Sequence, residues 1–203
     1  MAHFACLFRS FGEFFATGNP VPTYPYADAF SRLCVLLVRH YVDAQAQPAT
    51  PRPAGRIPIL DKILAVIVLY ASNLAMQKKV FPQRTLARIF SSLLYEFNAP
   101  HRVLDGCQMD IMLAVSEALY ALRASACPGW TFSWLELVSH RMFMPKILSK
   151  QRGWASFQRL IVDLFKVMAP FLRKPELNDQ LRHLYRGTLH VMLVLLHDFP
   201  EVR

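Results

Sequence analysis

The stretch Phe157-Gln-Arg-Leu-Ile-Val-Asp-Leu-Phe-Lys-Val-Met168 places apolar side chains at the spacing of one helix face. They recur at i, i+3, i+4 and i+7, which is the period of an amphipathic α-helix. The same spacing begins again at Phe30, at Leu86 and at Leu104. In no part of the sequence do apolar and polar residues alternate with period two between turn signals. The pattern therefore predicts an all-α chain.

Prolines divide the chain into pieces of about one helix each. Proline is tolerated in the first turn of a helix but costs about 3 kcal/mol in its interior, so regular placement indicates boundaries. The prolines that we interpret in this way are Pro58, Pro82, Pro100, Pro128, Pro145, Pro170, Pro175 and Pro200. The helices that we expect span residues 3–16, 26–45, 58–79, 83–97, 101–124, 130–144, 154–169 and 178–198.

The helices are expected to form one domain over residues 1–203, with an exposed proline-rich loop at 45–57. Starts two helices apart lie roughly 43–55 residues apart, close to the 40–47 residues of a HEAT-type repeat. Stacked antiparallel pairs in an α-solenoid are therefore the favoured architecture, and a compact helical bundle is the alternative.

Composition excludes several classes of protein. Hydrophobic residues make up 54% of the 203 residues and glycines number seven, which excludes a disordered or collagen-like chain. The formal charge of +9 favours acidic partners or nucleic acid. A basic cluster at Lys146, Lys150, Arg152 and Arg159, with Trp154 among them, fits either RNA binding or a solvated loop.

We expect no catalysis, no metal and no cofactor. The four cysteines lie far apart and are interpreted as buried, reduced thiols. His183, His190 and His197 recur every seven residues, too far apart along a helix to bind one ion. Glycine-rich phosphate loops and nucleophile elbows are lacking in the sequence, although Ser139, His140 and Asp163 could be combined on paper.

Membrane insertion and secretion are not expected either. The longest apolar run, 63–76, has 14 residues, whereas a span needs about 20. The N-terminal apolar stretch has no basic region before it and contains Glu13, unlike a signal peptide. A cytosolic or nuclear location is the resulting expectation.

A longer motif runs from Trp134 to Lys146 and reads Trp-Leu-Glu-Leu-Val-Ser-His-Arg-Met-Phe-Met-Pro-Lys. With the stretches 160–165, 169–173, 184–189 and 193–200, it closely resembles the C-terminal Not homology domain of the Not-one scaffold subunits of the Ccr–Not deadenylase complex. The resemblance is strongest to the first part of that domain. It extends weakly upstream to Phe30. The sequence departs from it in a shorter loop at 149–152 and at His190, where arginine is typical.

The resemblance implies HEAT-like helical pairs and a non-catalytic scaffold role in mRNA deadenylation, mRNA decay and translational repression. It implies docking of Not-two and Not-three/five type subunits and of short peptides from RNA-binding regulators, with nucleases bound elsewhere on the scaffold. A free-standing basic RNA-binding helical-repeat protein is the alternative. The residues that we expect to contact partners are His140, Arg141, Met144, Lys146, Arg173, Leu193 and Leu196.

Three structural expectations follow from the apolar stripes. The core should contain Trp134, Leu164, Phe165, Leu189 and Leu196. The last helix should continue through Gly187, with a neighbouring helix close by. The same helix is apolar around most of its circumference, and with no helical pair after it in this sequence, we expect an exposed apolar patch along it.

Overall fold

The computed structural model describes residues 24–45, 55–76, 81–173 and 179–202. The expected helix at 3–16 lies outside these residues, as does most of the expected loop at 45–57. At the two ends of that range, Gln45 is the last residue of a helix and Ile57 is buried.

All regular structure in the described residues is helical. The elements are α2 (Pro25–Gln45), α3 (Pro58–Met76), α4 (Gln83–Asn98), α5 (Arg102–Asp105), α6 (Gln108–Ala121), η1 (Pro128–Trp130), α7 (Thr131–Val138), α8 (Met144–Leu148), α9 (Gln151–Leu172), α10 (Asp179–Asp198) and η2 (Pro200–Val202). The predicted fold class is thereby confirmed.

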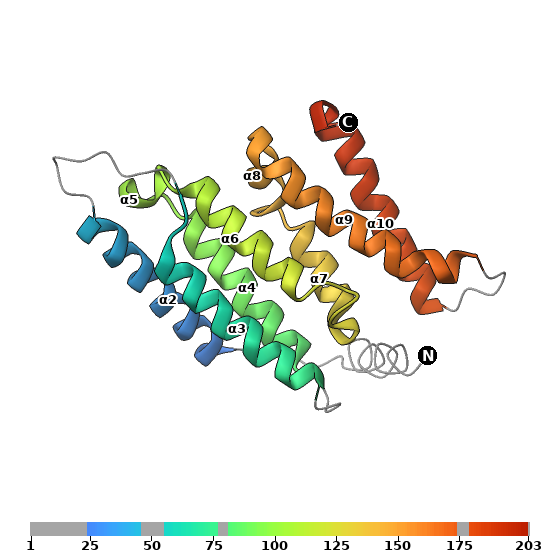
Figure 1. Ribbon diagram of the computed structural model, residues 1–203, viewed down its shortest axis with the longest axis horizontal. Coiled ribbons are helices and arrows are strands. Elements are labelled where there is room, and N and C mark those ends of the chain that lie inside the picture. The colour runs from blue at the N-terminus through green and yellow to red at the C-terminus, as the bar shows by residue number, and fades with distance from the viewer. Residues whose placement is uncertain (1–23, 46–54, 77–80, 174–178, 203) are drawn as a thin grey trace.

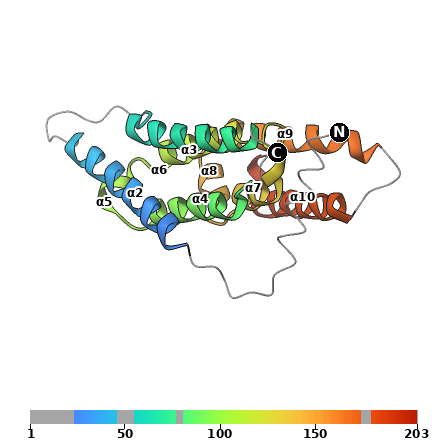
Figure 2. The ribbon, with the colours of Figure 1, turned by 90° about the horizontal axis from the view of Figure 1, so that it is seen from below.

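The long helices alternate between two layers, as Figure 2 shows from the side. One layer holds α3, α6 and α9, and the other holds α2, α4, α7 and α10 (Figures 1 and 2). Contacts run between neighbours within each layer, from α2 to α4 to α7 to α10 and from α3 to α6 to α9. This zigzag gives an open helical stack of the solenoid type and not a closed bundle.

Two of the expected helices are broken. The helix expected at 101–124 ends at Asp105 and restarts at Gln108, because Gly106, a poor helix former, occupies the turn between α5 and α6. The helix expected at 130–144 ends at Val138, where the Ser139 hydroxyl donates to the Leu135 carbonyl at 2.8 Å. Pro145 then lies in the first turn of the short helix α8.

The boundary expected at Pro170 is wrong. Helix α9 includes this proline and continues to Leu172. Because Pro170 lies in the last turn, the hydrogen bond that it removes is one of few remaining before the helix ends.

The core centres on the two tryptophans of the η1–α7 segment, Trp130 and Trp134, which are fully buried. The Trp130 Nε1–H donates to the Leu122 carbonyl and the Trp134 Nε1–H to the Leu119 carbonyl, both at 2.8 Å. These bonds satisfy the indole groups and the carbonyls at the end of α6, so both rings are buried without an unpaired polar atom. Trp134 and Leu164 confirm the expected core.

Three other residues assigned to the core are exposed: Phe165, Leu189 and Leu196. On α9 the buried face follows Phe157, Leu160, Leu164 and Met168, and Phe165 lies about 100° around the helix from Leu164. A single neighbouring helix covers only part of a wide apolar stripe. The stripes on α9 and α10 are wider than the faces that the stack covers.

Gly187 lies inside α10, which continues unbroken through it, as predicted. A Cβ built there would lie 3.3 Å from Leu135 Cδ2 on α7. The close approach of the neighbouring helix is therefore confirmed as well.

Helix α3 is long and apolar enough, by length and composition, to cross a membrane, and among the described residues only this helix meets that test. The 14-residue apolar run in the sequence underestimated the length of this helix, which begins at Pro58. One such helix is weak support for a span. One side of α3, with Leu60, Leu64, Ile67 and Ala71, is buried and the helix contacts α6 and α2, while 22% of its most apolar 18-residue stretch is buried.

Candidate docking surfaces

An exposed leucine face runs along α10. Leu189, Leu193 and Leu196 lie at i, i+4 and i+7, and their side chains are 44%, 62% and 55% exposed. The opposite side of the helix, with Leu184, Thr188 and Val191, is buried against the stack. The Thr188 hydroxyl donates to the Leu184 carbonyl of the same helix at 2.8 Å, which satisfies this polar group on the buried side. The expected apolar patch on this helix is confirmed.

A second surface surrounds the turn between α7 and α8. It is a cavity of about 470 Å³, lined by His140 and Arg141 together with Tyr95 and Glu96 of α4. The His140 Nδ1 accepts the backbone N–H of Met142 at 3.2 Å. Burial, reinforced by the charge of Arg141, lowers the pKa of His140, so its ring is neutral at pH 7.

The rim of this cavity is held by Asp28 of α2. Its carboxylate accepts two hydrogen bonds from Arg88, both at 2.7 Å, and one from the Ser92 hydroxyl at 2.6 Å. These bonds lower the pKa of Asp28. Since Arg88 and Ser92 belong to α4, the cluster connects the first two helices of its layer, and its exposure limits its contribution to stability to about 1 kcal/mol or less.

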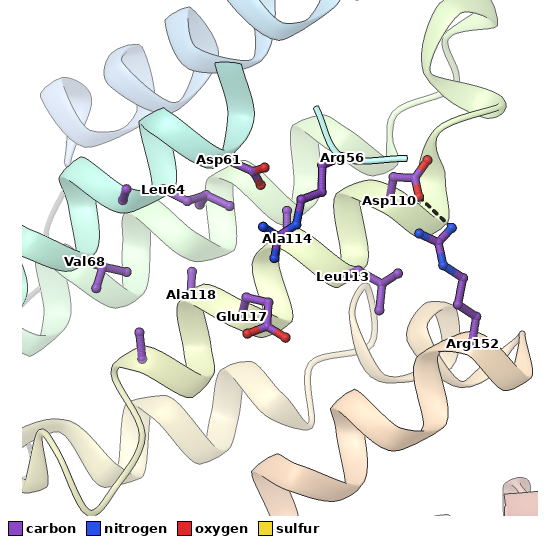
Figure 3. Close-up of a pocket in the computed structure, with 12 residues that line it drawn as sticks. Arg56, Asp61, Leu64, Val68, Asp110, Leu113, Ala114, Glu117, Ala118 and Arg152 are labelled. Atoms are coloured by element: carbon purple, nitrogen blue, oxygen red, sulfur yellow. Dashed lines mark hydrogen bonds and ion pairs between the residues drawn. The ribbon is translucent and has the colours of Figure 1, made fainter. Parts of the chain in front are cut away.

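The third surface is a groove of about 450 Å³ between the N-terminal half of α3 and the length of α6. Figure 3 shows Ala114 and Ala118 on the apolar floor, with the Arg56 side chain reaching toward Ala114 and Glu117 beside Ala118. In the first turn of α6, Asp110 accepts a hydrogen bond from the Arg152 guanidinium at 2.7 Å. Small side chains on the floor permit close approach of another chain.

Two of the four basic residues in the cluster, Arg152 and Arg159, form ion pairs within the chain. Arg152 pairs with Asp110, and Arg159 pairs with Glu117 at 3.2 Å while its guanidinium stacks 4.0 Å from the centre of the Tyr120 ring. The Trp154 indole N–H donates to the Leu148 carbonyl at 2.9 Å. These contacts join α9 to α6 and to α8, so the aromatic ring and both arginines have structural partners.

The structure separates the remaining predicted contact residues. Met144 is buried in the core and is not available at the surface, because α8 turns it inward with Ile147 and Leu148. Lys146 and Arg173 are exposed on α8 and just after α9. Of the seven residues, His140 and Arg141 share one cavity, and Leu193 and Leu196 share one helix face.

The structure does not bring Ser139, His140 and Asp163 together as a catalytic triad. The Asp163 carboxylate instead accepts from the Ser125 hydroxyl at 2.8 Å and pairs with Arg123 at 3.4 Å, while Ser139 donates to Leu135. Within the described ranges, no group of three or more His, Cys, Asp or Glu is placed to hold a metal ion.

Sequence reasoning missed the α3–α6 groove and the α4 side of the second cavity. The groove depends on the spacing of two helices 50 residues apart, and the cavity on the contact of α4 with the α7–α8 turn. One feature of the sequence could have indicated the groove. Ala114, Ala118 and Ala121 lie on one side of α6, and their small side chains leave room beside that helix.

Comparison with known proteins places the chain among subunits of one complex. The family model for "CCR4-Not complex component, Not1" matches residues 94–202, from the end of α4 to η2. The CCR4-NOT transcription complex subunit let-711 of Caenorhabditis elegans is 33% identical over 187 residues, which cover 86% of this chain and 7% of that protein. General negative regulator of transcription subunit 1 of Schizosaccharomyces pombe is 32% identical over 186 residues, covering 88% and 8%. The chain thus spans less than a tenth of these relatives.

Two solved structures have a similar fold. The NOT1 superfamily homology domain from Chaetomium thermophilum is 26% identical with a TM-score of 0.76, covering 99% of this chain and 38% of that one. A Not1 C-terminal domain, solved in complex with Not4, is 24% identical with a TM-score of 0.67, covering 98% and 40%. The second likeness concerns the fold alone.

Proposed function

Because the chain belongs to the Not1 family of CCR4-Not complex components, we propose that it is a non-catalytic scaffold segment that docks other subunits of that complex. The observation that carries the proposal is the family match over residues 94–202, which includes every described helix from α5 to α10. A stack of helices with exposed apolar faces suits such a role, since it offers long surfaces for partners.

The proposed partners are Not-two and Not-three/five type subunits, with short peptides of RNA-binding regulators as a further class. We include a Not4 type subunit among the proposed partners, because a Not1 C-terminal domain of similar fold was solved in complex with Not4. Through these partners the chain would act in mRNA deadenylation, mRNA decay and translational repression. The cytoplasm is the proposed site of action, with the nucleus as a second location.

The leucine face of α10 is the surface that we assign to docking. Full burial of one leucine side chain contributes about 1.5–3 kcal/mol, so three half-exposed leucines offer several kcal/mol to a partner that covers them. Their placement inside the matched region connects this surface to the family role.

Affinity capture tests the proposal. The tagged chain, expressed in cells of its own organism, should enrich Not-two, Not-three/five or Not4 type subunits, and the double variant Leu193→Glu/Leu196→Glu should lose at least 90% of that enrichment. The matched control, Val66→Glu/Leu69→Glu, places the same charges on exposed residues of α3 and should retain it. Quantitative mass spectrometry of the eluates, with circular dichroism of each variant, provides the readout. Capture of none of these subunits by the folded wild-type chain would refute the docking role.

We expect weak binding to RNA, contrary to the alternative of a basic RNA-binding protein. The net charge of +9 favours polyanions, but Arg152 and Arg159 are committed to carboxylates on α6. Titration of a fluorescent 20-nucleotide RNA at about 0.15 M salt should give a dissociation constant above about 1 μM. The affinity should fall steeply as salt is added. Submicromolar binding that resists competitor would favour the alternative.

A further inference from the structure

The exposed stripe of α10 is longer than its three leucines. About one and two turns before Leu189, Arg186 and Arg182 lie on the same side of the helix, and both are exposed. The five residues follow one another at intervals of four, three, four and three, which is the spacing of a helix that packs lengthwise along another helix. We call these residues the α10 seam: Arg182, Arg186, Leu189, Leu193 and Leu196.

The seam lies opposite the face that α10 buries. At about 100° per residue, its five side chains fall within about 80° of one another, and the buried Leu184 and Val191 lie on the other side of the helix. Helix α10 contacts α7 within its layer, and none of the described helices lies beyond it (Figures 1 and 2). The part of the chain that the structure describes therefore leaves the seam open over about 21 Å, at about 1.5 Å per residue.

The two halves of the seam differ in chemistry. The C-terminal half carries the three leucines, and the N-terminal half carries two guanidinium groups. Arg182 lies 3.9 Å from the Asp179 carboxylate in the first turn of the same helix, an exposed pair that holds the guanidinium only weakly. Arg186 forms no ion pair with any described residue. Both cations can therefore accept carboxylates of a partner.

The seam also has two unlike flanks. His183, His190 and His197 recur every seven residues, so they lie along one edge of the seam at equivalent positions. Tyr185 and Met192, which are partly exposed, lie along the other edge. The apolar contact is thus wider on one side than on the other, which gives a partner one preferred direction of approach.

A second copy of the chain fits the seam poorly. If two seams paired in parallel, Arg182 and Arg186 would face the same arginines of the other copy, and facing like charges disfavour association. If they paired antiparallel, each arginine would face a leucine. Neither arrangement supplies carboxylates to the guanidinium groups.

We propose that the α10 seam binds an amphipathic helix of a partner protein, with apolar side chains opposite the three leucines and carboxylates opposite Arg182 and Arg186. The apolar contacts supply affinity, and the charge pairs set the register and select the partner. The inference rests on the docking role proposed above for α10. It adds the chemistry of the partner, a helix that is apolar over one half of its contact face and acidic over the other.

Synthetic helical peptides test this chemistry on the full chain. Each fluorescein-labelled peptide carries a seam of the same spacing with three leucines and two glutamates, the glutamates at one end or at the other, and each has a counterpart with lysines in place of the glutamates. At about 50 mM salt, fluorescence anisotropy should show one glutamate peptide binding at least 10-fold more tightly than its lysine counterpart. Arg182→Glu/Arg186→Glu should reverse that preference.

The matched control reverses two exposed cations elsewhere, Arg32 on α2 and Lys62 on α3. Arg32→Glu/Lys62→Glu changes the net charge by the same amount and should keep the preference for glutamate. Circular dichroism verifies that each variant is folded. Equal affinity for glutamate and lysine peptides, binding of neither, or a preference that Arg182→Glu/Arg186→Glu leaves unchanged would overturn the proposal. So would a wild-type dimer in sedimentation that Leu193→Glu disperses, since a second copy would then occupy the seam.

The result is separable from that of the proposed function. If Ccr–Not subunits are captured through the leucines and Arg182→Glu/Arg186→Glu retains both their capture and the peptide affinities, the docking role stands and the acidic helix is wrong. If the glutamate peptide binds with the expected preference and none of those subunits is captured, the chemistry of the seam stands and its assignment to those subunits is wrong.

Discussion

Replacing Trp134 with alanine is expected to lower the free energy of unfolding by about 3–5 kcal/mol. The side chain is fully buried between α6, α7 and their neighbours, and its indole N–H donates to the Leu119 carbonyl. Alanine would leave both a cavity and a carbonyl without its partner at the end of α6. Urea denaturation followed by circular dichroism measures the change.

Phe165→Ala is the matched control for that substitution. It removes an aromatic ring of comparable size from an exposed position on α9, so we expect a loss of about 1 kcal/mol or less. Similar losses for the two variants would contradict the division between buried and exposed faces that the structure assigns.

Gly153→Ala is expected to destabilise the chain by about 3 kcal/mol or more, although alanine is the better helix former. Gly153 lies in the first turn of α9, directly against α8. A Cβ there would overlap the backbone carbonyl oxygen of Ile147 and lie 2.8 Å from its Cγ1. Because a backbone atom cannot move aside as a side-chain end can, the start of α9 would have to shift. Thermal unfolding of the variant reports the loss.

Gly187→Ala provides the contrast inside α10. The nearest atom to its added Cβ is Leu135 Cδ2, the end of a flexible side chain, at 3.3 Å. The gain in helix propensity of about 1 kcal/mol should offset the small adjustment, so stability should change by less than about 1 kcal/mol. A large loss here, or none at Gly153, would show that the packing of the two glycines is misassigned.

The sequence predicted the all-α class, the position of most long helices and the burial of Trp134 and Leu164. These features depend on local periodicity and on large apolar side chains, both of which are visible in one chain. It did not predict the breaks at Gly106 and Ser139, because the apolar spacing continues across each short turn. Pro170 shows the converse, since a helix end tolerates a proline that its interior would not.

The assignment of Phe165, Leu189 and Leu196 to the core failed for one physical reason. Periodicity gives the direction of an apolar stripe but not how much of its width a neighbour covers. On α2 the apolar stripe that starts at Phe30 is likewise only partly covered, since Cys34 and Val38 are buried and Phe30 is exposed. The sequence predicts an exposed patch on α10 because that helix is apolar on nearly every side, but it does not show that Leu189 and Leu196 belong to the patch.

Direct titration of the purified chain with purified Not-two, Not-three/five and Not4 type subunits of the same organism tests the scaffold role most directly. Isothermal calorimetry should show saturable one-to-one binding to at least one of them, with a dissociation constant below about 10 μM, or about −7 kcal/mol. Leu193→Glu/Leu196→Glu should weaken that binding at least 10-fold, and Val66→Glu/Leu69→Glu should leave it unchanged. A folded, monomeric wild-type chain that binds none of these subunits would contradict the account.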